Sequence, residues 1–283
     1  MLLWVILLLL IAVGVAGGLL GSLAGLGGGV VIVPILVIGL GVPLLEAIGA
    51  SAVSVLATST TTGAAYVRDH ITDVRIGMFL EIATVPGALL GVTATLVLAK
   101  VGLQPLLLFI LGVVLLITVL DGVRHRPAGD QPVPADARSL RLHLEGSYLD
   151  LHDHREVRYR AGRTNPAFAT MFGAGLVSGM FGIGSGALKV TALERFLGLP
   201  VKVATATSNF MIGVTVAASS GILLLAGAVN PLLAAPVALG TVTGSFLGSR
   251  ILPRARNEIL RVLFLGAVAA LATELVLRGA GVA

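Results

Sequence analysis

The chain has 283 residues, of which 56% are hydrophobic and only 12% are charged, and its mean hydropathy is +1.02. Ordinary globular domains carry about 25% charged residues, so these values exclude a soluble globular domain. There is no cysteine, which excludes disulfides and thiolate metal sites. The pI of about 10.2 does not indicate nucleic acid as a partner, because the lysines and arginines lie between hydrophobic segments, as topology determinants do. The composition predicts an all-α polytopic membrane protein.

The first hydrophobic block, residues 2–40, contains no charged side chain. Its start resembles a signal-peptide core, but it lacks a basic n-region and belongs to an internal repeat, so we expect it to be retained. A membrane span needs about 20 residues, and this longer block is interrupted by the glycine tract "GLGGG" at 25–29. The block is therefore either one long span with a tail or two helices folded back at the glycines.

Three further blocks, 46–66, 74–99 and 104–122, complete an N-terminal membrane repeat over residues 1–122. The polar linker that follows, residues 123–165, contains eight arginines and four of the five histidines. Leu140, Leu142 and Leu144 alternate with polar residues, which predicts short strands with a turn near Gly146. The motif "HDH" at 152–154 could ligate a metal, but we expect a solvated turn there.

The second half of the chain, residues 166–283, repeats the first. Its hydrophobic blocks are 166–197, 203–226, 231–252 and 257–277. An offset of 157 residues, without a gap between Gly25 and Gly91, superimposes the glycine tracts, Pro43 on Pro200 and Ser51 on Ser208. We call residues related by this offset repeat mates. Internal repeats of this kind are typical of secondary transporters.

The distribution of positive charge selects the topology. If the first block of each half crosses the membrane once, loops on the side of the linker hold 11 lysines and arginines, against six on the other side. If the block enters and returns, the count is 15 against two. Positive residues accumulate in the cytoplasm. We therefore predict two inverted repeats, each beginning with a glycine-broken helical hairpin, a cytoplasmic linker with a small β-element, and both termini outside.

The glycine tracts predict a site. Irregular backbone is allowed within a bilayer only where it is buried in protein or lines a cavity. Helices that begin after the tracts would direct free N–H groups and positive dipole ends inward, where an anion can bind. Small residues such as Gly175 and Gly179 also bring helices together, so we expect both packing along the helices and a site at the tracts. The substrate contacts predicted at the tracts are Gly27, Gly28, Gly29, Gly184, Ser185 and Gly186.

Only the second half carries a charge beside its tract. Lys189 lies three residues after Gly186, and its repeat mate is the apolar Ile32. A lysine at the bilayer centre costs at least about 2.5 kcal/mol, so it is expected to serve a purpose. Three roles stay open: contact with an anion, a salt bridge to Glu81 or Glu194, or extension of the side chain to the membrane surface.

Hydroxyl and carboxyl groups supply the remaining candidates. The second block of each half is rich in hydroxyls, which either bind the anion or donate to the preceding helical turn. The candidate anion ligands there are Ser51, Thr58 (the repeat mate of Thr215), Thr207, Ser208 and Asn209. Glu81 and Glu274 lie within predicted spans and are candidates for coupling to H+ or Na+, with a salt bridge to Lys189 or Arg261 as the alternative role.

The motifs resemble a known family. The segments "GLGGGVVIVP" and "GIGSGALKV", each followed by an "LGxP"-like turn and a serine-containing helix, resemble the sulfite exporter TauE/SafE family, also called the toluene-sulfonate uptake permease family. The resemblance covers both halves and implies movement of sulfite, sulfonates or related organosulfur anions across the bacterial cytoplasmic membrane. Ser185 and Thr191 depart from it, because many members have glycine and proline there. The motif positions are 25–29, 182–186, Lys189, Ser51, Ser208 and Asn209.

The sequence therefore predicts a secondary transporter of a small sulfur-containing anion that works by alternating access in the cytoplasmic membrane. An anion channel and a transporter of a different small organic anion are the alternatives. No Walker-type motif is present, so neither ATP coupling nor a cofactor is expected. The predicted spans contain no histidine, cysteine or HExxH motif, so we expect neither an enzyme nor a metal centre.

Overall fold

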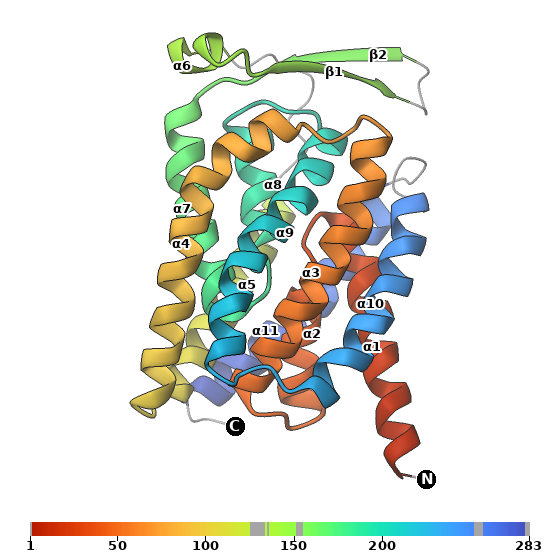
Figure 1. The fold of residues 1–283 in the computed structure, drawn as a ribbon, viewed down its shortest axis with the longest axis vertical. Helices are drawn as coiled ribbons and strands as arrows, with labels where there is room; N and C mark the ends of the chain where they lie inside the picture. Colours follow the sequence, from red (N-terminus) through yellow and green to blue (C-terminus); the bar gives the residue numbers. More distant parts are fainter. Residues whose placement is uncertain (1, 125–133, 135, 151–154, 252–256, 281–283) are drawn as a thin grey trace.

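The computed structural model describes residues 2–124, 134, 136–150, 155–251 and 257–280 (Figure 1). The N-terminal half consists of α1 (Leu2–Ala24), α2 (Gly29–Pro34), the π-helical η1 (Ile35–Gly39), α3 (Leu44–Arg68), α4 (Val74–Lys100) and α5 (Gln104–Arg124). The linker forms α6 (Ala137–Arg141), β1 (Glu145–Asp150) and β2 (Arg155–Arg160). The C-terminal half consists of α7 (Thr164–Phe181), α8 (Gly186–Arg195), α9 (Val201–Leu225), α10 (Pro231–Ile251) and α11 (Asn257–Gly279).

Five of the described helices, α1, α3, α4, α9 and α10, are long and apolar enough to cross a membrane. Large apolar side chains point outward from them: Trp4, Leu225 and Leu232 are all more than two-thirds exposed. Extended apolar surface of this kind is rare on soluble monomers and fits a surface that faces lipid. A mostly helical, multi-pass membrane protein is thereby confirmed.

The helix boundaries follow the repeat offset. The bounds of α3 and α9 lie 157 residues apart at both ends, as do the starts of α4 and α10. The largest packing partners lie in opposite halves, because α1 packs against α10, α7 against α4, α3 against α9 and α5 against α11. The apolar core consequently forms between the halves, where Val55, Ile212 and Val216 are fully buried.

The two hairpins start from opposite ends of the molecule. In Figure 1, α1 begins and α11 ends at the lower end of the view, whereas the β1–β2 hairpin covers the upper end, where α7 begins. The first hairpin, α1 with α2, returns to the lower end. The second, α7 with α8, returns to the upper end. The linker and the described ends of the chain therefore lie at opposite ends of the bundle.

The linker contains the expected β-element, but the predicted turn near Gly146 is wrong. Gly146 lies within β1 and pairs with Tyr159 of the antiparallel β2. Leu140 belongs to α6, which begins because Asp136 accepts a hydrogen bond from the Ser139 N–H at 2.8 Å as its N-cap. This cap overrides the alternating pattern that predicted a strand. The "HDH" motif at 152–154 lies outside the described residues.

Two aspartates join the linker to the bundle. Asp73, the N-cap of α4, accepts a hydrogen bond from the Tyr159 hydroxyl at 3.1 Å. Burial and the Asp73 carboxylate raise the pKa of Tyr159, which therefore remains a donor at neutral pH. Asp136 accepts from the Thr164 N–H and hydroxyl at the start of α7. Burial acts to raise the pKa of Asp136, but the hydrogen bonds from Thr164 and Ser139 outweigh it and lower the pKa.

Small residues set the distance between α7 and α4. A Cβ atom on Gly179 would fall 2.7 Å from Ala88 Cα, and one on Gly175 would fall 2.8 Å from Thr84 Cα. Gly173 lies on the same helix with nothing within 4 Å of its Cβ position. Gly175 and Gly179 therefore serve close packing of two helices, as small residues do in membranes.

We predict that Gly179→Ala lowers the thermal midpoint of the detergent-solubilised protein by several degrees. The added methyl group overlaps helix backbone that no rotamer change can move away, and overpacking of this kind costs about 1–3 kcal/mol. Gly173→Ala is the matched control and should leave the midpoint unchanged or slightly raised, because alanine has the higher helix propensity. Equal midpoints for the two variants would show that α7 and α4 do not approach this closely.

Candidate functional site

Both hairpins break at the glycine tracts. Gly25, Gly27 and Gly28 have φ values of 70°, 78° and 80°, between the end of α1 and the start of α2. Their repeat mates Gly182, Gly184 and Ser185 have φ values of 61°, 79° and 47°, between α7 and α8. Positive φ favours glycine, which explains the composition of both tracts. Ser185 is the exception, because it holds a left-handed conformation that its mate Gly28 adopts without strain.

The two turns meet. A Cβ atom on Gly29 would fall 2.6 Å from Ile183 Cα, and one on its mate Gly186 would fall 2.8 Å from the carbonyl carbon of Gly25. Gly27 and Gly184 both face the side chains of Val55 and Ile212, which are themselves repeat mates. The backbone of each turn thus lies against the other at the centre of the bundle.

Ser51 and Ser208 connect the turns reciprocally. The Ser51 hydroxyl donates to the Gly182 carbonyl at 2.9 Å, and the Ser208 hydroxyl donates to the Gly25 carbonyl at 3.0 Å. Each serine therefore satisfies a carbonyl where a helix of the opposite half stops. A hydroxyl has one proton to donate, so in this conformation neither serine can donate to an anion as well.

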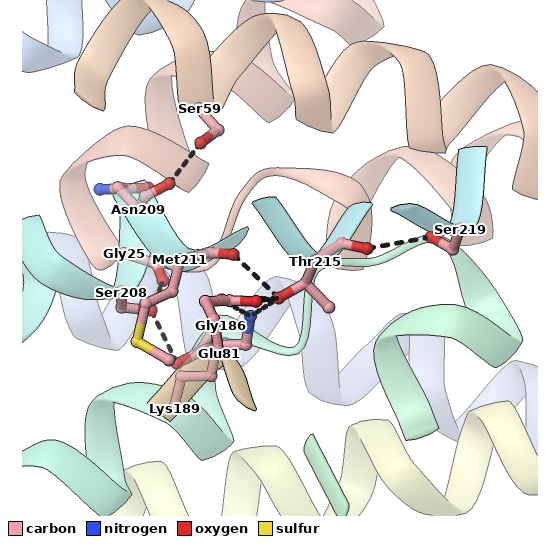
Figure 2. A network of polar contacts seen from close by, with 10 residues as sticks. All are labelled: Gly25, Ser59, Glu81, Gly186, Lys189, Ser208, Asn209, Met211, Thr215 and Ser219. Atoms are coloured by element: carbon pink, nitrogen blue, oxygen red, sulfur yellow. Dashed lines mark hydrogen bonds and ion pairs between the residues drawn. The ribbon is translucent and has the colours of Figure 1, made fainter. Parts of the chain in front are cut away.

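Lys189 belongs to a buried network with Glu81 and Thr215 (Figure 2). Its ammonium donates to the Thr215 hydroxyl oxygen at 2.5 Å and lies 3.7 Å from Glu81 Oε1. The Thr215 hydroxyl also lies 2.9 and 3.0 Å from the two Glu81 carboxylate oxygens. Lys189 and Thr215 are fully buried, and the Glu81 side chain is only 4% exposed. Of the roles open for Lys189, the structure thus contains the salt bridge to Glu81.

The beginning of α8 adds polar groups close to this network. Side chains of a helix lean toward its N-terminus, so Lys189 in the first turn extends back toward the glycine turn. Ser185, the N-cap of α8, is 4% exposed and its hydroxyl has no hydrogen-bond partner. A buried hydroxyl without a partner is costly, and its place beside a helix N-terminus and a lysine suits a ligand with negative charge.

The other predicted ligands lie elsewhere. Thr58 donates to the Ser54 carbonyl of its own helix at 3.1 Å, and Thr207 accepts from the Asp73 N–H at 3.0 Å near the linker end. Glu274 pairs with Arg278 at 2.8 Å on the partly exposed face of α11. These hydrogen bonds and this ion pair do not join them to the Lys189 network.

Asn209 lies near the first turn. Its side-chain amide donates to the Ser22 carbonyl at 3.2 Å, its backbone carbonyl accepts from Ser59, and its side-chain carbonyl oxygen is buried without a partner. Like the hydroxyls of Ser185, Ser178 and Thr84, it is a buried polar group with unused hydrogen-bonding capacity.

The sequence does not single out Thr215 or the pair Val55 and Ile212. Thr215 shares its hydroxyl-rich context with its mate Thr58, and only Lys189 and Glu81 on other helices distinguish the two. Among the described residues, no cluster of three histidine, cysteine, aspartate or glutamate side chains could hold a metal ion. The polar centre consists of the Lys189–Glu81 ion pair, hydroxyl groups, the Asn209 amide and backbone groups.

Helices interrupted around a buried polar centre, inside a bundle of membrane spans, define the class of membrane transporters. The chain matches the family described as "Sulfite exporter TauE/SafE" over residues 10–275 and belongs to that family. It is 28% identical over 251 residues to "Probable membrane transporter protein YunE" of Bacillus subtilis (strain 168), covering 86% of this chain and 87% of that protein. No solved structure matches the chain. The resemblance found in the glycine motifs is thereby confirmed.

We predict that Lys189→Met and Glu81→Leu each lower the yield of monodisperse protein and its thermal midpoint. Removing one partner leaves the other charge buried and unpaired, which typically costs about 3–5 kcal/mol. The double variant should recover most of the loss, because no lone charge remains.

Arg278→Met and Glu274→Leu form the matched control pair. Their exposed salt bridge is expected to contribute at most about 1 kcal/mol, so the single variants should lose little. Single variants at Lys189 and Glu81 that are as stable as the wild type would contradict the buried pair.

Proposed function

We propose that the chain is a secondary transporter of a small sulfur-containing oxyanion, such as sulfite or a sulfonate, that works by alternating access. The observation that carries the proposal is the fully buried Lys189 in the first turn of α8, a helix whose N-cap Ser185 has a buried hydroxyl without a hydrogen-bond partner. The site would consist of this ammonium, the Ser185 hydroxyl and the N–H groups that begin α8. Membership in the TauE/SafE family supports the substrate class.

An oxyanion fits these donors chemically. Sulfonate and sulfite oxygens accept hydrogen bonds from hydroxyls, ammonium groups and helix N-termini alike. The apolar walls at Val55 and Ile212 suit the carbon chain of an organosulfonate. These two side chains lie against both glycine turns, at the centre of the bundle.

The proposed movement requires two repeats of inverted orientation, with the linker in the cytoplasm and both termini outside. The repeat offset, the reciprocal serine bonds and the opposite directions of the two hairpins (Figure 1) support this arrangement. Helix α3 ends at Arg68, and Lys202 lies in the first turn of α9. Both of these helix ends lie at the linker end of the bundle, as does Arg75, which donates to the His143 carbonyl of the linker (Figure 1). Lys100 ends α4 at the opposite end.

Single cysteines test the topology directly, because the native chain contains none. We expect a membrane-impermeant maleimide to label Lys202→Cys only from the cytoplasmic side and Lys100→Cys only from the outside. Labelling of both positions from one side would contradict the inverted arrangement.

Ligand binding tests the site. In a thermal-shift screen of sulfite, thiosulfate, taurine, sulfoacetate and isethionate, we expect at least one anion to raise the midpoint of the wild type. Ser185→Gly restores the residue found at the mate position and removes left-handed strain of about 1 kcal/mol, so it should fold at least as well as the wild type. It should bind the anion about tenfold or more weakly, because a hydrogen bond to a charged group is lost.

Lys189→Ala should abolish the anion-dependent shift altogether, and Lys100→Ala, at the exposed end of α4, is the matched control that keeps it. A shift that Lys189→Ala and Ser185→Gly both leave unchanged would remove the beginning of α8 from the site. In vesicles, saturable flux with counterflow is expected, whereas ohmic single-channel currents would establish a channel instead.

A further inference from the structure

We propose that Glu81 binds one proton for each singly charged anion that the protein carries, so that transport is an electroneutral proton–anion symport. This inference rests on the proposed anion transport and concerns the network of Glu81, Lys189 and Thr215 (Figure 2). It assigns a coupling ion and a substrate charge, neither of which follows from membership in the family.

The centre is electrically neutral without a ligand. The Lys189 ammonium and the Glu81 carboxylate lie 3.7 Å apart, both buried, and their charges cancel. The elements packed around Glu81 bring few other charges: α7 contains no titratable residue within its bounds, and α9 has only Lys202, in its first turn. Apart from Lys189, the charged residues of α8 and α5 lie in the last turns of these helices. They are Glu194 and Arg195 in α8, and Asp121 and Arg124 in α5.

An anion cannot use Lys189 while Glu81 is ionised. The Glu81 carboxylate is already paired with the Lys189 ammonium and would repel a second negative group. With an anion bound, the site would carry one uncompensated buried charge, which is costly. A proton from solution that binds one carboxylate oxygen removes both obstacles. The protonated acid is neutral, the ammonium balances the anion, and the loaded centre is again neutral.

Thr215 allows this exchange without any helix movement. Its single hydroxyl proton has three acceptors in reach: the two Glu81 oxygens and the Met211 carbonyl at 2.8 Å. When Glu81 is ionised, Thr215 donates to it and accepts from Lys189. When Glu81 is protonated, the acid donates to the Thr215 oxygen, and Thr215 turns its proton to the Met211 carbonyl. The Thr215 hydroxyl and the Glu81 carboxyl group therefore have a hydrogen-bond partner in both protonation states.

The stoichiometry follows from the asymmetry of the repeat. The mates of Lys189, Glu81 and Thr215 are Ile32, Ala238 and Thr58, so this constellation occurs once per chain. One proton site and one buried cation balance one negative charge. The site is consequently suited to isethionate or hydrogen sulfite, whereas a doubly charged anion such as sulfoacetate would leave a net negative charge.

The test uses full-length protein in proteoliposomes, with isethionate as the probe of charge −1. For the wild type, a gradient of one pH unit should drive about tenfold accumulation of isethionate on the alkaline side, with acidification there, because one proton moves with each anion. A membrane potential of about 60 mV should drive none. In Glu81→Gln the two driving forces should exchange roles. The membrane potential of about 60 mV should drive about tenfold accumulation of isethionate on the positive side, and the pH gradient should drive none.

Three further variants keep the test decisive. Glu274→Gln, the matched carboxylate on α11, should retain proton-driven accumulation. Thr215→Ser should retain it and Thr215→Val should lose it, because only serine preserves the hydroxyl. If Glu81→Gln does not fold, the wild-type response to the pH gradient and the potential still decides whether protons are coupled.

The outcomes separate the two proposals. Isethionate accumulation that follows the potential rather than the pH gradient in the wild type overturns proton coupling but leaves anion transport intact. Proton-driven accumulation that persists in Glu81→Gln overturns the assignment of Glu81, whatever the result for Glu274→Gln. A wild type that neither binds nor moves any anion of the screened set overturns the proposed function itself.

Discussion

A helix that stops inside a bilayer leaves backbone carbonyl and N–H groups that no surrounding water can satisfy. This chain stops two helices there, at Gly25 and Gly182, and supplies the missing donors from the opposite half through Ser208 and Ser51. Neither turn can be completed by its own half alone. The same dependence appears in the packing of α1 on α10 and of α7 on α4, so the two repeats form one folded unit.

The two halves have similar helices but differ in their buried charges. The first turn carries no charged side chain of its own half, because Ile32 lies at the position where the second half has Lys189. The second turn places a buried ion pair and an unpartnered serine hydroxyl next to the start of a helix. The matching positions of the two halves thus account for the two breaks, while differences at a few mate positions account for the ion pair and the serine hydroxyl.

Much of the fold could be predicted because its pattern is local and repeated. Charge counts and the offset of 157 residues were sufficient to predict broken hairpins, and the bounds of α3 and α9 keep that offset. The contacts of the site were harder to predict because they join distant segments. Periodicity shows that Ser51 and Ser208 are mates, but not that their hydroxyls serve the opposite turn. The strand predicted across Leu140 is wrong because a local N-cap at Asp136 favoured a helix instead.

The proposed transport requires an anion that takes the Lys189 ammonium from Glu81 at the beginning of α8. The most direct measurement is an experimental structure with 2-bromoethanesulfonate bound, in which the bromine identifies the ligand. We predict sulfonate oxygens about 2.7–2.9 Å from the Lys189 ammonium, a hydrogen bond to Ser185, and Glu81 in contact with Thr215 but no longer with Lys189. A sulfonate bound elsewhere, with the contacts among Lys189, Glu81 and Thr215 unchanged, would contradict the account.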